Sequence, residues 1–155
     1  MNARKILFPT DFSTLSDAAL THATTLARES GATLLIVHVE EPPAAYGMGE
    51  MYYGIPDPDD TALHEMLHDV VPTDPKVPCE YRLLVGHPAD EIVALAEKEK
   101  VDLIVMGTHG RTGLTRLLMG SVAELVVRRA TCPVITFKAP QHERTATSKA
   151  WSNPV

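Results

Sequence analysis

The feature that most constrains the fold is a set of short runs in which nearly every residue is apolar. The clearest is Thr33–Val39, T-L-L-I-V-H-V, in which polar and apolar residues do not alternate. A strand of this composition must be covered on both faces, which is typical of parallel sheets. Similar runs at Lys5–Pro9, Glu80–Val85, Leu103–Met106 and Val134–Phe137 predict four more buried strands.

The segments between these runs predict helices. Apolar residues recur at helical spacing before Gly31, within Thr61–Val71, after Gly86–Pro88 and within Ser121–Ala130. Strands that alternate with helices form parallel sheets through right-handed crossovers. The sequence therefore predicts an α/β, Rossmann-like single domain. Its mostly parallel five-stranded sheet has the order 3-2-1-4-5, and helices cover both faces.

Length and composition limit what else the chain can be. Its 155 residues suit one domain, which we expect to span residues 1–138, with a polar, mobile tail at 139–155. The net charge of −6 argues against nucleic-acid binding. No apolar run approaches the roughly 20 residues of a membrane span, and we recognise no signal peptide, so we expect a cytoplasmic protein. Cys79 and Cys132 begin apolar runs and are interpreted as buried free thiols.

A glycine-rich segment follows the predicted strand Leu103–Met106. It carries glycines at positions 107, 110, 113 and 120, contains Arg111 and Arg116 but no carboxylate, and leads into a helical pattern at Ser121. Glycine lets the main chain approach an anion closely, and the first amides of a helix attract negative charge. This segment therefore predicts a phosphate site.

Two other strand ends are expected beside this segment. Ligands of doubly wound sheets bind outside the carboxyl ends of the strands. Those ends carry Pro9–Asp11, Val39–Glu41 and Met106–Gly110. Three separate pieces of sequence should therefore form one pocket.

The chain resembles the universal stress proteins of the UspA type, specifically their ATP-binding branch, over residues 3 to 138. The likeness rests on I-L-F-P-T-D-F-S from Ile6, L-I-V-H-V from Leu35, G-H-P-A-D-E-I from Gly86, and V-M-G-T-H-G-R-T-G from Val105. The family's nucleotide signature, G-x2-G-x9-G-[ST], is matched at every fixed position from Gly107 to Ser121.

The resemblance implies roles for individual residues. It implies that Asp11 lies near the adenosine and that the backbone of Val39 recognises adenine, while glycines, His109 and Ser121 hold ribose and phosphates. Arg111 either reaches the γ-phosphate or faces solvent. The candidate nucleotide-binding residues are Pro9, Thr10, Asp11, Val39, Met106, Gly107, His109, Gly110, Arg111, Gly120, Ser121 and Val122.

The resemblance further implies that the chain binds ATP, with Mg or Mn as the expected ion, and forms a homodimer through Val134–Phe137. We expect a nucleotide-dependent regulatory module rather than an enzyme, because no base or nucleophile is evident near the loop except Asp11 or His109. The alternatives are a slow ATPase, a binder of AMP or cyclic AMP, and a scaffold of the same fold without a nucleotide.

Several of these residues have simpler interpretations. Ser121 and Glu124 spell a capping box, and Glu124 would repel a phosphate unless it points away or pairs with a metal or Arg128. Asp11 is also a good helix N-cap. His38, inside a buried strand, is interpreted as structural. His64 and His68 lie four residues apart, but no third metal ligand is placed.

Overall fold

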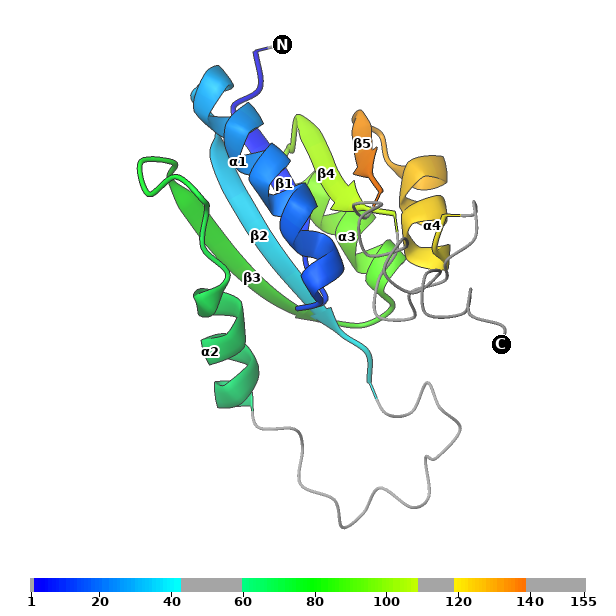
Figure 1. Cartoon of the computed structure of the whole chain (residues 1–155). Coiled ribbons are helices and arrows are strands. Elements are labelled where there is room, and N and C mark those ends of the chain that lie inside the picture. The colour runs from blue at the N-terminus through cyan, green and yellow to red at the C-terminus, as the bar shows by residue number, and fades with distance from the viewer. Residues whose placement is uncertain (1, 43–59, 109–118, 139–155) are drawn as a thin grey trace, which may run out of the picture.

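The computed structural model describes residues 2–42, 60–108 and 119–138, in which strands and helices alternate along the chain (Figure 1). The strands are β1 (Lys5–Pro9), β2 (Thr33–Glu40), β3 (Cys79–Val85), β4 (Leu103–Gly107) and β5 (Val134–Phe137). The helices are the 3-10 turn η1 (Thr14–Ser16) and α1 (Asp17–Ser30), α2 (Asp60–Asp69), α3 (Pro88–Lys98) and α4 (Ser121–Arg129). The predicted elements are therefore all present, with ends shifted by a few residues.

The five strands form one sheet in the order β3-β2-β1-β4-β5, and every neighbouring pair is parallel. One face packs against α1 and α2, and the other against α3 and α4 (Figure 1). The predicted fold class and strand order are confirmed. Because all strands are parallel, their carboxyl ends meet at a single edge of the sheet.

Alternate residues of the central strands enter two separate cores. In β2, Leu34 and Ile36 pack on the α1 and α2 side, whereas Leu35 and Val37 pack on the α3 and α4 side. All four side chains are fully buried. A strand buried on both faces needs apolar residues at consecutive positions, which explains why the run does not alternate.

The first helix begins later than its capping residues predict. Asp11 does not cap α1, because Ser16 occupies the N-cap position of this helix. The Oδ1 of Asp11 instead accepts hydrogen bonds from the backbone N–H of Ser13 at 3.0 Å and from its hydroxyl at 2.6 Å. The 3-10 turn η1 then leads into α1 at Asp17. The Asp11 carboxylate thus shapes the turn that follows β1, and its interpretation as the cap of α1 is wrong.

Helices α1 and α3 end with the same hydrogen-bond pattern. The residue that adopts the left-handed conformation is of a different type in each. After α1, Gly31 has a φ of 70°, and Ala32 donates to Ala27. After α3, Lys100 has a φ of 52°, and Val101 donates to Ala96. Both are Schellman motifs, in which glycine is the favoured residue.

We expect Lys100→Gly to raise the free energy of unfolding by about 0.5–1 kcal/mol. The change removes the steric cost of placing a residue with a side chain in the left-handed conformation. The reciprocal change Gly31→Ala should lower it by about 1 kcal/mol, although nothing lies within 4 Å of the added Cβ. Urea unfolding of both variants measures the effects. If Lys100→Gly destabilises the protein, the conformational explanation is wrong.

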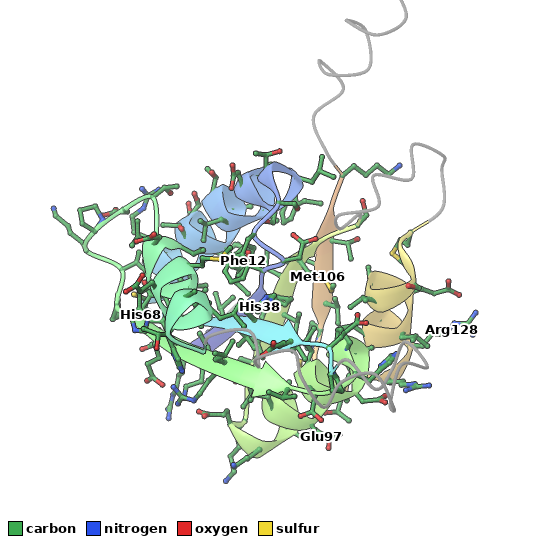
Figure 2. The ribbon with its side chains drawn as sticks, turned by 90° about the horizontal axis from the view of Figure 1, so that it is seen from below. Phe12, His38, His68, Glu97, Met106 and Arg128 are labelled. Atoms are coloured by element: carbon green, nitrogen blue, oxygen red, sulfur yellow. The ribbon has the colours of Figure 1, made fainter. Side chains whose placement is uncertain are left out.

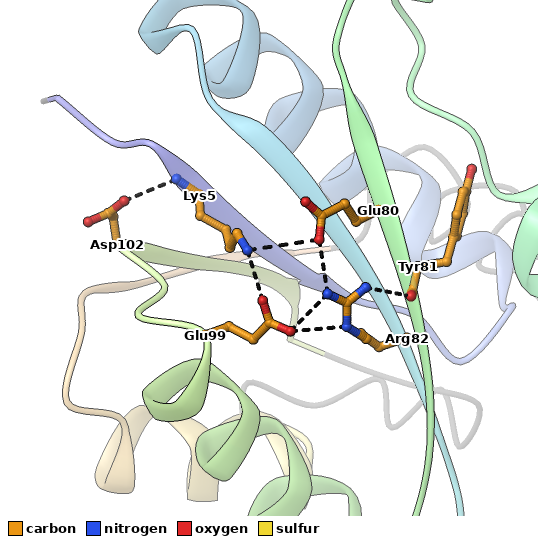
Figure 3. Close-up of polar contacts among 6 residues, drawn as sticks. All are labelled: Lys5, Glu80, Tyr81, Arg82, Glu99 and Asp102. Atoms are coloured by element: carbon orange, nitrogen blue, oxygen red, sulfur yellow. Dashed lines mark hydrogen bonds and ion pairs between the residues drawn. The ribbon is translucent and has the colours of Figure 1, made fainter.

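Charged side chains link β1, β3 and the end of α3 (Figure 3). Glu99 accepts a hydrogen bond from Lys5 Nζ at 2.8 Å and two from Arg82, from Nε at 3.0 Å and Nη2 at 2.9 Å. Its side chain is only 18% exposed. The hydrogen bond from Lys5, followed by that from Arg82, lowers the pKa of Glu99. Glu99 therefore holds two cations together between separate strands.

We expect Glu99→Gln to lower the free energy of unfolding by about 1 kcal/mol at pH 7. Because the pKa of Glu99 is lowered by folding, its charge stabilises the protein above the ordinary glutamate pKa of about 4.3, and this contribution disappears as pH falls through the lowered value. Urea unfolding at pH 7 and at successively lower pH compares the variant with the natural protein. Glu80→Gln, at a more exposed position of the same network, is the control and should have a smaller effect. A difference that persists at the lowest pH would contradict the electrostatic explanation.

Candidate functional site

A pocket of about 590 Å³ lies at the carboxyl ends of the strands, the edge that faces the viewer in Figure 2. It brings together the ends of β1, β2 and β4 and the start of α4, as the sequence predicts. All predicted site residues that the structure describes line this pocket, namely Pro9, Thr10, Asp11, Val39, Met106, Gly107, Gly120, Ser121 and Val122. His109, Gly110 and Arg111 lie outside the described residues.

The wall that follows β1 is a tightly bonded turn. The backbone N–H of Thr10 donates to Val37 O at 2.8 Å, and Thr10 Oγ1 accepts from the N–H of Phe12 at 3.0 Å. Phe12 has a φ of 65°, which is unusual for a bulky residue. Such strained backbone persists only where its surroundings hold it, and it is frequent at functional sites. These bonds fix Asp11 at the pocket wall.

The base of the glycine-rich segment is closed by backbone hydrogen bonds. The N–H of Gly120 donates to Thr108 O at 2.7 Å, so the residues on either side of the segment lie next to each other. The N–H of Thr108 donates in turn to Phe137 O at the end of β5, at 2.9 Å. The pocket therefore includes both Gly107 and Gly120, although they are far apart in sequence. Thr108, a buried pocket residue, was not predicted as a site residue.

Ser121 begins α4, and Gly120 occupies the N-cap position without a side-chain capping bond. The capping-box interpretation of Ser121 and Glu124 is therefore wrong. Glu124 Oε1 instead pairs with Arg128 at 2.9 Å, one turn further along the helix. This pairing occurs on the exposed side of α4, where Figure 2 places Arg128 away from Met106 and His38. The carboxylate that could have repelled an anion is thus held by a neighbouring cation.

The first amides of α4 carry a partial positive charge into the pocket. N–H groups in the first turn of a helix have no acceptor within the helix, and the helix dipole adds to their attraction for anions. Ser121, Val122 and Ala123, the first three residues of α4, all line the pocket. This end of the pocket is suited to a phosphate.

Carboxylates also line the pocket, where β1 and β2 end. Asp11 follows β1, Glu40 is the last residue of β2, and Glu41 follows it. Carboxylate oxygens accept hydrogen bonds, so this part of the pocket is suited to hydroxyl or amino groups. The pocket therefore fits a ligand that carries both hydrogen-bond donor groups and an anion.

Apolar residues of α2 and α3 complete the pocket. Leu63 comes from α2, whereas Pro88 and Ile92 come from α3. The sequence did not identify these residues as part of the site, because their spacing shows only that they face the core. Buried His38 was likewise interpreted only as structural, and its position directly before Val39 is the one signal that could have placed it here.

The other histidines and the cysteines do not form a metal site within the described residues. Those residues contain no group of three or more histidine, cysteine or acidic side chains arranged to hold a metal. His68 Nδ1 lies 2.8 Å from the backbone oxygen of His64 in a hydrogen bond. Cys79 and Cys132 are free and half-buried, and burial raises the pKa of Cys132. Within the part of the chain that the structure describes, no helix has the length and apolarity needed to cross a bilayer.

Comparison with known proteins gives a consistent result. The profile of the Universal stress protein family matches residues 2–138. Universal stress protein MJ0531 of Methanocaldococcus jannaschii is 40% identical over 146 residues, covering 90% of this chain and 85% of the relative.

Solved structures agree with the sequence relatives. The structure of protein MJ0577, also from Methanocaldococcus jannaschii, superposes with a TM-score of 0.70 and 29% identity, covering 90% of this chain and 99% of that one. A universal stress protein in complex with cAMP has a TM-score of 0.60 and 26% identity, covering 90% of this chain and all of the other. The shared sequence over nearly the whole described domain and the shared fold lead to one conclusion: the chain belongs to the universal stress protein family.

Proposed function

We propose that this chain is a regulatory protein that binds ATP in the pocket at the carboxyl ends of its strands. The observation that carries the proposal is that one pocket combines two chemically different kinds of lining group. The start of α4, next to Gly107 and Gly120, suits the phosphates, whereas Asp11 and Glu40 suit the donor groups of a nucleoside.

The size of the pocket and its relatives support an adenine nucleotide. Its volume of about 590 Å³ lies within the range of roughly 300–1,000 Å³ that is usual for small-molecule sites. The complex of a family member with cAMP supports an adenine ligand here as well. Charge-assisted hydrogen bonds of roughly 1.5–3 kcal/mol each, less the cost of association, are consistent with about micromolar affinity. Mg or Mn bound with the phosphates is part of the proposal.

The test begins with the purified protein as isolated. Denaturation followed by chromatography should release an adenine nucleotide, and calorimetry with ATP, AMP and cyclic AMP, each with and without Mg or Mn, should rank ATP first. At millimolar ATP, a micromolar site raises the free energy of unfolding by about 4 kcal/mol and therefore the melting temperature. Absence of both released nucleotide and a melting shift would exclude the site.

A slow ATPase is the second candidate, because Asp11 lies in the same pocket and could orient a water molecule. Incubation with ATP and Mg, followed by measurement of phosphate release, separates the two. We expect turnover well below about one per second, the lower limit of typical enzymes. Steady turnover above that rate would contradict the regulatory proposal.

We also propose that the protein is a cytoplasmic homodimer formed through β5. Within the described residues β5 pairs only with β4, and its Val134, Ile135 and Phe137 are half-buried. Apolar edge strands are usually paired or covered. Light scattering at micromolar concentration should therefore give twice the mass of the chain, and Ile135→Lys should shift it to the monomer. A monomer of the unaltered protein would contradict the proposal.

A further inference from the structure

His38 makes a hydrogen bond that fixes the state of its ring. Its side chain is only 8% exposed, and Nδ1 lies 2.8 Å from the backbone oxygen of Thr10. A carbonyl oxygen can only accept, so Nδ1 must carry the proton. In the neutral ring, Nε2 is then left with a lone pair and acts as an acceptor.

The lone pair on Nε2 reaches open space. Nε2 has no hydrogen-bond partner among the described residues. Every completely buried side-chain nitrogen or oxygen of those residues does have a partner, so Nε2 is not completely buried. Nε2 is therefore accessible, and His38 is one of the residues that line the pocket. A buried imidazole thus presents an acceptor to the ligand site.

The ring is held firmly in this orientation. Its centroid lies 4.2 Å from that of Phe12, the strained residue of the turn after β1, and Figure 2 shows the two side chains next to each other near the centre of the carboxyl edge. Contact with Phe12 on one side and the bond to Thr10 on the other restrict rotation about the side-chain bonds. An acceptor held in this way loses little further entropy when a ligand binds.

We propose that His38 is a specificity-determining residue of the pocket, whose Nε2 accepts a hydrogen bond from an N–H or O–H group of the bound nucleotide. The inference rests on the proposed nucleotide function and adds to it. A ribose hydroxyl and the amino group of adenine have the same donor chemistry. Nδ1 donates a separate hydrogen bond to the carbonyl of Thr10 and thereby stabilises the turn that carries Asp11.

The test compares ATP with three analogues that each lack one donor: 2′-deoxy-ATP, 3′-deoxy-ATP and purine riboside triphosphate. Calorimetry at pH 8 should show that the natural protein binds one analogue about 3–10-fold more weakly than ATP, as expected for one lost hydrogen bond. His38→Asn keeps an amide donor near the position of Nδ1 but has no atom at Nε2. It should bind ATP about 3–10-fold more weakly and lose the discrimination against that analogue.

Two further variants separate ligand contact from support of the turn. His38→Gln places an amide oxygen near the position of Nε2 and should recover part of the discrimination, whereas His38→Phe keeps the ring contact with Phe12 and should recover none. Melting temperatures without ligand show whether each variant is folded. If His38→Asn retains full affinity and full discrimination against all three analogues, His38 has only a structural role.

A measurement on the unaltered protein covers the case in which the variants do not fold. The 15N resonance of the unprotonated Nε2 of His38 should move upfield when ATP is added, because the lone pair then accepts a proton donor. An unchanged resonance at saturating ATP overturns the inference while leaving the nucleotide function intact. Absence of ATP binding to the natural protein would overturn the proposed function as well.

Discussion

Ser121→Asp should weaken ATP binding by about 100-fold or more without destabilising the protein. Ser121 is the exposed first residue of α4 and lines the pocket, whereas Gly120 occupies the N-cap position. A carboxylate there interacts favourably with the helix dipole, by about 0.3–1 kcal/mol. The same charge would lie close to a bound phosphate, and two like charges about 4 Å apart repel by about 4 kcal/mol at an effective dielectric constant of 20.

Calorimetry with ATP and urea unfolding of the same samples measure the two effects. Ser121→Ala is the matched control, because it removes the hydroxyl without adding charge, and it should weaken binding by less than about 10-fold. Asn2→Asp adds the same charge at an exposed position before β1, outside the pocket lining, and should leave the affinity unchanged. Ser121→Asp with unaltered ATP affinity would show that the phosphates do not lie at the start of α4.

Phe8→Ala should have the largest effect on stability, lowering the free energy of unfolding by about 3–5 kcal/mol. Phe8 lies in β1, the central strand, and is completely buried. Among the described residues it is the largest of the fully buried side chains. It packs in the core beneath α1, and its register partner is Ile36 of β2. The change removes a large apolar surface and leaves a cavity that neighbouring strands cannot close.

Such a loss is a large part of the 5–15 kcal/mol that stabilises a typical domain. Urea unfolding gives the difference, with Val127→Ala as the control. Val127 lies on α4 and is 42% exposed, so its truncation should change the free energy of unfolding by less than about 0.5 kcal/mol. A loss below about 1.5 kcal/mol for Phe8→Ala would mean that the core around β1 relaxes into the cavity.

The strands and the position of the candidate pocket could be predicted because they depend on local sequence. Consecutive apolar residues in Thr33–Val39 require cover on both faces, and this requirement alone favours a parallel sheet. In a parallel sheet the carboxyl ends of the strands share one edge, so the sequence alone predicts that Asp11, Val39 and Gly107 lie together. The family resemblance then indicated a nucleotide as the expected ligand.

Interactions between side chains were predicted less well. The sequence S-V-A-E after Gly120 contains a capping box, but the structure pairs Glu124 with Arg128 and leaves the N-cap position to Gly120. Asp11 likewise bonds to Ser13 rather than to the start of α1. In each case two local partners compete for one carboxylate, and the path of the surrounding backbone decides between them.

The sequence by itself therefore determined the elements, their parallel arrangement and the edge of the sheet where the candidate pocket lies. Only the tertiary structure decided which further residues join the pocket: Leu63 from α2, Ile92 from α3, and His38 with one nitrogen committed to Thr10. The periodicity of apolar residues shows that a residue is buried, but it does not show which residues of other elements it packs against. That depends on how distant segments pack against each other, which no local pattern contains.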